Sequence, residues 1–239
     1  MPKSFYVFFI FLIAGISASA QSKVGTWGIF TAIMPGDSAH RWGGYSELQL
    51  RENSTFNQFN YYEIKAGISY DLDKAFTALI GGGRYTTYDY QNLGAGPNTI
   101  EARFWEQMIV NQYLYRIKLE HRYRIEQRWL NGIYRNRFRY RLNVFVPLNS
   151  TKIEAKTWFV SVFEEIFLNN KEPNFERNRI SAALGYQFDK KWILQAGWIN
   201  QYNYVPNLSN DKDNVLLMLM YRINRKNSAK REHMPSTGD

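Results

Sequence analysis

Basic side chains recur at alternate positions in one stretch of this chain, between residues 115 and 146. The series consists of Arg116, Lys118, Arg122, Arg124, Arg128, Arg135, Arg137, Arg139 and Arg141, and it also includes the acidic residues Glu120 and Glu126. A guanidinium group presents a forked set of donors that matches phosphate and carboxylate groups. Rings of arginine or lysine are also how anion pores select their ions. The chemistry suggested by these residues is therefore the binding or passage of anions.

The residues between these charges are mostly apolar, and they identify the element that carries the arginines. They begin Tyr115, Ile117, Leu119, His121, Tyr123, Ile125, Gln127 and Trp129. A period of two is typical of a β-strand with unlike faces. Asn131-Gly132 follows, and this dipeptide strongly favours a two-residue hairpin turn. The turn predicts a register that pairs Leu130 with Ile133, Glu126 with Arg137, Ile125 with Phe138, Arg124 with Arg139, Tyr123 with Tyr140 and His121 with Leu142.

This register sets Arg124 opposite Arg139 and Arg122 opposite Arg141, so these arginines need acidic partners. Two interpretations stay open. In the first, the charges form an internal salt-bridge network that fills a narrow barrel. In the second, the excess of arginine makes the lumen attractive to small anions. The candidate lumen residues are Glu120, Arg122, Arg124, Glu126, Arg128, Arg137, Arg139, Arg141 and Glu165.

No other constellation favours a catalytic or metal site. His121 lies on the apolar face, as in an outer-membrane phospholipase, but the serine expected two residues later is Tyr123. The three histidines lie far apart and cysteine is absent, so the sequence predicts no metal site and no cofactor. The glycine run at 81–83 lies inside an expected strand, where glycine usually marks a bulge, a bend or room for a large neighbour.

The N-terminus has the features of a secretory signal peptide, with Lys3 before an apolar segment at 5–16 and a cleavage site at Ala18-Ser19-Ala20. A net charge of +9 would suggest nucleic-acid binding in an intracellular protein, but secretion and arginines on strand faces argue against it. The expected organisation is a signal peptide at 1–20, a β-barrel domain at 21–224 and a disordered polar tail at 225–239.

Eleven strand-like segments follow the signal peptide, near 24–33, 42–51, 59–71, 75–89, 99–110, 115–129, 134–148, 157–168, 176–188, 192–203 and 213–224. Because bacterial single-chain barrels normally have an even number of strands, we expect ten or twelve and exclude eleven. Segment 24–33 would then be an extra strand with a missed partner, or a piece inside the barrel. With ten strands, short links near 71–74 and 189–191 are periplasmic turns, and both barrel ends are periplasmic.

Aromatic residues make up 17% of the chain and cluster near strand ends, as in the girdles of outer-membrane barrels. They include Trp27, Trp42, Tyr88, Tyr90, Trp105, Trp129, Tyr134, Trp158, Trp192 and Tyr202. These features predict an all-β fold, a closed antiparallel transmembrane β-barrel with its apolar face toward lipid. A soluble periplasmic β-sandwich would show the same alternation. The strand lengths and the apolar face that a sandwich would expose to water argue against it.

Four blocks of the sequence resemble the uncharacterised secreted proteins grouped as domain of unknown function 2490. The blocks are Arg124–Arg128, Arg137–Leu142, Glu165–Asn169 and Phe175–Arg179, and the resemblance extends to Trp27. It implies an outer-membrane β-barrel of a Gram-negative cell and places Glu126, Arg128, Arg139 and Glu165 in the polar core of the family. It implies no activity.

The sequence therefore predicts a non-enzymatic outer-membrane protein, with a narrow passive pore for small anions as the leading hypothesis. Two other hypotheses stay open: an outer-membrane enzyme that modifies lipid or lipopolysaccharide, and a plugged-barrel scaffold that binds anionic glycolipid. The expected partners are outer-membrane lipid, lipopolysaccharide, the barrel-assembly machinery during biogenesis and small anionic solutes. Nucleic acid is not expected.

Overall fold

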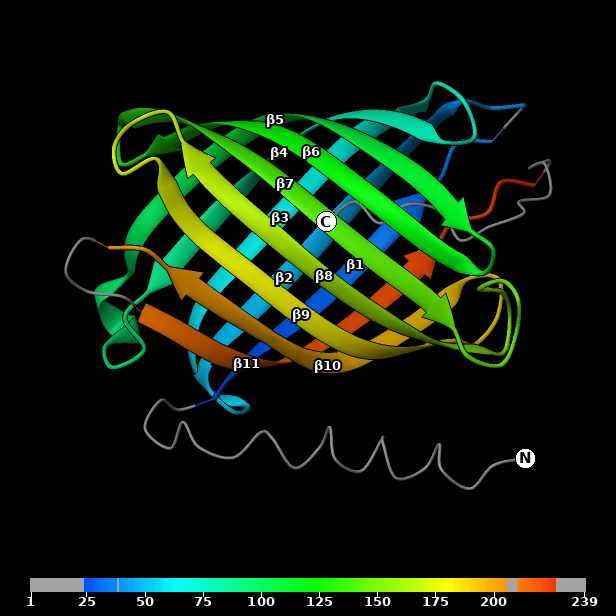
Figure 1. Ribbon diagram of the computed structural model, residues 1–239. Helices are drawn as coiled ribbons and strands as arrows, with labels where there is room; N and C mark the ends of the chain where they lie inside the picture. Colours follow the sequence, from blue (N-terminus) through cyan, green and yellow to red (C-terminus); the bar gives the residue numbers. More distant parts are fainter. Residues whose placement is uncertain (1–23, 38, 206–209, 227–239) are drawn as a thin grey trace.

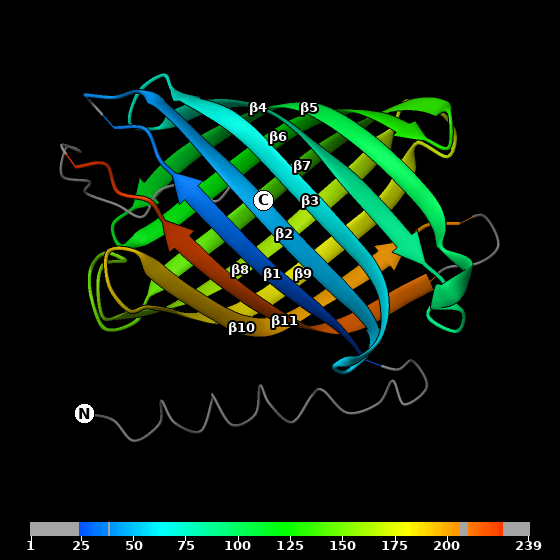
Figure 2. The same cartoon turned by 180° about the vertical axis from the view of Figure 1, so that it is seen from behind.

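The computed structural model describes residues 24–37, 39–205 and 210–226, which form a closed β-barrel (Figures 1 and 2). Its strands are β1 (Gly25–Met34), β2 (Trp42–Ser54), β3 (Asn57–Asp71), β4 (Phe76–Tyr88), β5 (Pro97–Leu114), β6 (Ile117–Leu130), β7 (Ile133–Pro147), β8 (Thr157–Asn169), β9 (Phe175–Gln187), β10 (Trp192–Asn203) and β11 (Asn210–Arg222). Each strand pairs with the next along the chain, and β1 pairs with β11 to close the ring. The expected signal peptide and nearly all of the expected tail lie outside the described residues.

The described barrel has eleven strands, so the expectation of ten or twelve is wrong. Segment 24–33 is a full barrel strand, β1, and it runs parallel to β11, with Trp27 beside Leu216 and Ile33 beside Arg222. Strands that alternate in direction around a closed ring leave one parallel pair when their number is odd. For the same reason, the two ends of the barrel sequence lie at opposite ends of the barrel, not on one side (Figure 2).

The predicted hairpin is confirmed. Asn131 and Gly132 adopt positive φ angles of 47° and 81°, the geometry of a type I′ turn. All the predicted pairs, from Leu130–Ile133 to His121–Leu142, occur between β6 and β7. The Asn-Gly turn therefore sets the register locally, before any other strand is considered.

The two faces of the barrel differ sharply in polarity. The adjacent residues Glu63 and Ile64 are 3% and 56% exposed, respectively, because one points into the barrel and the other points outward. The same alternation buries Arg124 and exposes Ile125. The charged side chains are thus mainly in the interior, and the exterior is mainly apolar. The barrel is closed, so the alternative of two packed sheets is wrong. In the part of the chain described here, no helix is long and apolar enough to cross a membrane.

Aromatic pairs ring both ends of the outer surface. We call the end at which β2, β4, β6, β8 and β10 finish the loop end, and the opposite end the turn end. The pairs at the turn end are Trp42–Tyr70, Trp158–Tyr186 and Trp192–Tyr221, and those at the loop end are Tyr62–Tyr88, Trp129–Tyr134 and Phe175–Tyr202. Trp27 and Trp105 depart from the expected girdles, because both point inward and are at most 5% exposed.

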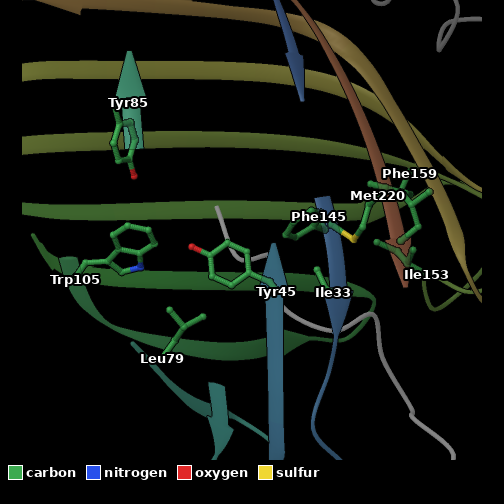
Figure 3. Packing of buried hydrophobic residues seen from close by; sticks show 10 residues of the cluster. Ile33, Tyr45, Leu79, Tyr85, Trp105, Phe145, Ile153, Phe159 and Met220 are labelled. Atoms are coloured by element: carbon green, nitrogen blue, oxygen red, sulfur yellow. The ribbon is translucent and has the colours of Figure 1, made fainter. Parts of the chain in front are cut away.

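An apolar cluster lies across the interior, mainly toward the turn end (Figure 3). Its ten buried side chains are Ile33, Tyr45, Leu79, Tyr85, Trp105, Phe145, Ile153, Phe159, Ile193 and Met220. Nine of these residues come from strands distributed around most of the ring, and Ile153 comes from the link between β7 and β8. We call this group the apolar layer.

Inward glycines make room for the rings of the apolar layer. A Cβ atom at Gly185 would lie 2.2 Å from the Phe159 ring, and one at Gly81 would lie 2.7 Å from Trp105. The glycine run at 81–83 therefore provides room for a large neighbour, one of the three roles expected from the sequence. Gly83 does the same for the side chain of Lys65.

Candidate functional site

A polar cavity of about 260 Å³ lies inside the barrel near its loop end. It is lined by Arg51, Tyr61, Glu63, Lys65, Tyr85, Thr87, Thr99, Glu101, Arg103, Arg128, Leu130, Arg137, Arg139, Phe167, Arg177 and Arg179. Tyr85 also belongs to the apolar layer, and Tyr61 packs against that layer. The cavity therefore ends where the apolar layer begins.

The part of the cavity nearest the loop end is accessible to solvent, whereas its inner part is almost fully buried. The side chains of Arg51 and Arg128 are each 13% exposed, whereas that of Arg137 is 1% exposed. Access is therefore from the loop end, and charges deeper in the barrel interact with little screening by water.

The charge of the lining is unequal. Among the described residues, eight basic and two acidic side chains line the cavity. Three more carboxylates, Glu126, Glu165 and Glu176, form ion pairs with lining arginines from outside the lining. Basic groups remain in excess when these three are included. The cavity is therefore an environment that favours an anion.

Two buried glutamates satisfy the arginine pairs that face each other across the hairpin. Glu126 lies 2.5 Å from Arg139 and 3.6 Å from Arg124. Glu165 lies 2.5 Å from Arg122 and 2.9 Å from Arg141. Each opposed pair therefore shares one carboxylate, which removes the like-charge conflict expected from the register.

A single ring organises four of the lining arginines. Phe167 is fully buried, and guanidinium groups of β7 and β9 lie 4.6 to 5.6 Å from the centre of its ring. The four are Arg137, Arg139, Arg177 and Arg179. Cation–π contacts of this kind contribute about 0.5–2 kcal/mol each and hold the flat guanidinium groups in defined orientations.

The structure brings only part of the predicted lumen set to the cavity. Arg128, Arg137 and Arg139 line it, and all nine predicted residues point inward. The others do not line the cavity. Glu126 and Glu165 form ion pairs with its arginines, and Arg124 and Arg141 lie beside those two carboxylates. Glu120 forms an ion pair with Lys118 at the turn end. Arg122 binds Glu165.

The sequence interpretation missed cavity residues on other strands, among them Arg51, Lys65, Arg103, Arg177 and Arg179. The alternation of polar and apolar residues on β2, β3, β5 and β9 could have indicated that these residues point inward, since each lies on the polar face of its strand. No short-range pattern indicates that β2 and β9 contribute to the same cavity.

His121 lies on the outer face, as expected. Its Nδ1 is 2.9 Å from the Tyr140 hydroxyl, and its Nε2 has no hydrogen-bond partner in the described structure. No serine or carboxylate among the described residues completes a catalytic set with it. The same residues contain no group of three or more histidine, aspartate or glutamate side chains placed to hold a metal ion.

Comparison with known proteins identifies a family and no activity. The model of a family described as "Protein of unknown function (DUF2490)" matches residues 24–212. No curated protein and no solved structure matches the chain.

Proposed function

This chain belongs to the DUF2490 family of proteins of unknown function, and we propose that it is an outer-membrane β-barrel that binds a small anion inside its loop end. The inverted polarity of the barrel supports a membrane location. Apolar side chains such as Ile64 and Ile68 are more than half exposed, which would promote aggregation in water but suits the hydrocarbon core of a bilayer. Aromatic pairs at both ends match the two interfacial girdles of outer-membrane barrels.

The observation that carries the binding function is the excess of basic side chains around the cavity. Arginines in a poorly hydrated site attract anions more strongly than the same groups in water. The partly exposed Arg51 and Arg128 provide an entry from the loop end. The expected ligand is therefore a small anionic solute, and outer-membrane lipid and lipopolysaccharide are the proposed surroundings of the barrel.

A narrow passive pore for small anions, the leading hypothesis from the sequence, would use the same arginines. The apolar layer opposes the continuous passage of ions, because it places buried apolar side chains from most of the ring below the cavity. We therefore expect no steady conductance when the protein is inserted in planar bilayers. A stable conductance with an anion-selective reversal potential would favour the pore over the binding barrel.

An outer-membrane enzyme that acts on lipid or lipopolysaccharide has less support, since the contact of His121 on the outer face is the Tyr140 hydroxyl. In the alternative of a plugged scaffold that binds anionic glycolipid, the apolar layer would be the part of the barrel that blocks the lumen. Lipopolysaccharide that is retained through purification and lost when cavity arginines are replaced would favour the scaffold.

Two measurements test the proposal. The first is extraction of the full chain from outer membranes with detergent, followed by gel migration with and without boiling. A heat-dependent shift is expected for a closed barrel. The second is calorimetric titration of the purified protein with chloride, acetate, sulfate and phosphate. Extraction by salt alone, or the absence of binding by every anion, would contradict the proposed function.

A further inference from the structure

We infer that Arg51, Arg177 and Arg179 form a subsite for a phosphoryl group within the cavity. This inference rests on the proposed function and names the chemistry of its ligand. The three arginines share a feature that distinguishes them from the other lining arginines. Each is oriented by a neutral side-chain amide, not by a close carboxylate.

The two arginines of β9 show this arrangement directly. The Nε of Arg177 donates to Asn203 Oδ1 at 2.7 Å, and the Nε of Arg179 donates to Gln201 Oε1 at 2.9 Å. Arg177 forms no ion pair with any described residue. The nearest carboxylate oxygen to Arg179 belongs to Glu165 and is 3.8 Å away. Both amide oxygens fix the guanidinium groups without neutralising them.

Arg51 on β2 is held in the same way. When the Gln49 amide takes the orientation that satisfies its neighbours, its oxygen accepts from Arg51 Nε at 3.0 Å and its nitrogen donates to Glu63 at 2.7 Å. Glu63 lies 3.6 Å from Arg51 but only 2.7 Å from Lys65. That carboxylate therefore interacts mainly with the lysine.

Two aromatic rings connect the three arginines. The guanidinium carbons of Arg51 and Arg179 lie 3.7 and 4.9 Å from the centre of the Trp27 ring. Those of Arg179 and Arg177 lie 4.7 and 5.6 Å from the centre of the Phe167 ring. The positive groups are thus linked through these two rings, although they come from distant parts of the sequence.

The rest of the network is compensated by carboxylates. Arg137, for example, lies 2.5 Å from Glu126 and 2.7 Å from Glu176. The distant partner of Arg179, Glu165, is 2.5 Å from Arg122. Buried positive charge without a close counter-ion is costly, and a bound anion would relieve that cost. The least compensated positive charge of the cavity is therefore found at the three amide-held arginines.

A phosphoryl group fits this arrangement better than a monovalent anion. Its oxygens can accept hydrogen bonds from several forked donors, and its second ionisation, near pH 6 for phosphate esters, supplies two negative charges. The cavity of about 260 Å³ also has room for a substituent on the phosphate. The hydroxyl of Tyr85, which lines the cavity and has no hydrogen-bond partner in the described structure, is available to that substituent.

The test is calorimetric titration of the full barrel in a non-ionic, phosphate-free detergent at constant ionic strength. The probes are inorganic phosphate, a hexose 1-phosphate, sulfate, chloride and acetate, with vesicles containing lipid A as a separate arm. We expect both phosphates to bind at least about 10-fold more tightly than chloride or acetate. The affinity of the hexose 1-phosphate should rise as pH increases through about 6, where its dianion forms, and that of inorganic phosphate should rise at a higher pH.

Arg177→Gln and Arg179→Gln should each weaken phosphate binding by at least about 10-fold, the usual effect of losing a charged hydrogen bond. Arg177→Lys, which keeps the charge but not the fork, should lose less than Arg177→Gln. The matched control is Arg84→Gln, because Arg84 is an exposed arginine on the outer face. Every variant is checked for heat-dependent gel migration, so that a failure to fold is not scored as a loss of binding.

The outcomes separate the subsite from the general function. Anion binding that persists unchanged in the Arg177 and Arg179 variants, or that shows no preference for phosphate, would overturn the subsite and leave the binding barrel intact. If the wild-type protein bound none of these anions, both the phosphoryl subsite and the proposed anion-binding function would be overturned. Saturable binding of lipid A vesicles without binding of free phosphates would assign the phosphoryl group to a lipid headgroup.

Discussion

Replacement of Glu165 by glutamine should destabilise the barrel far more than the same replacement at the adjacent Glu164. Glu165 is fully buried and lies 2.5 Å from Arg122, 2.7 Å from Arg139 and 2.9 Å from Arg141. Glu164 points outward, and its contact is a hydrogen bond of 3.0 Å from Asn178. The pair compares one chemical change on the two faces of a single strand.

The expected magnitude follows from the contacts. Glu165→Gln removes the negative charge shared by several buried guanidinium groups and leaves one carbonyl oxygen to accept hydrogen bonds. Breaking a buried ion pair by removing one partner typically costs about 3–5 kcal/mol. That is a large share of a typical unfolding free energy of about 5–15 kcal/mol. An exposed substitution such as Glu164→Gln should change the unfolding free energy by no more than about 0.5 kcal/mol.

The difference in unfolding free energy between the two variants is measured by urea unfolding in phospholipid vesicles. The folded fraction at each urea concentration is read from gel migration without boiling. The wild-type protein and the double variant complete the comparison. A loss below about 1 kcal/mol for Glu165→Gln would contradict the buried network, since it would mean that the carboxylate is not needed to hold its arginines. A larger loss for Glu164→Gln than for Glu165→Gln would reverse the assignment of inner and outer faces.

Two further predictions concern packing and pH. Gly185→Ala should cost about 1–3 kcal/mol of unfolding free energy, because the added Cβ would overlap the buried ring of Phe159. Gly28→Ala should be tolerated, since a Cβ at Gly28 would have nothing within 4 Å. Equal unfolding midpoints for the two variants would refute the packing argument. Asp189 lies in the β9–β10 turn, and backbone N–H donors, chiefly that of Trp192, lower its pKa below the ordinary aspartate value. The contribution of Asp189 to folding stability should be complete at pH values above the ordinary aspartate pKa and should disappear as pH falls through the lowered pKa. A carbon-13 NMR titration that gave Asp189 an ordinary pKa would contradict this prediction.

Local patterns in the sequence were sufficient for much of the fold. All eleven strand segments were located within a few residues of their observed bounds, because side chains alternate strictly along a strand that separates two unlike environments. The β6–β7 register was predicted from Asn131-Gly132 alone, since a two-residue turn leaves one pairing in which Arg124 faces Arg139. The inward direction of the arginines followed from the same alternation.

The closure of the ring and the composition of the cavity were decided by the tertiary structure. The parallel pairing of β1 with β11 joins Trp27 to Leu216, and no local signal specifies a contact between residues so far apart in the chain. The same closure brings Arg51 of β2 and Arg179 of β9 to the ring of Trp27. An alternating pattern says which way a side chain points. Which strands face one another across the lumen depends on the number of strands and on how the ring closes.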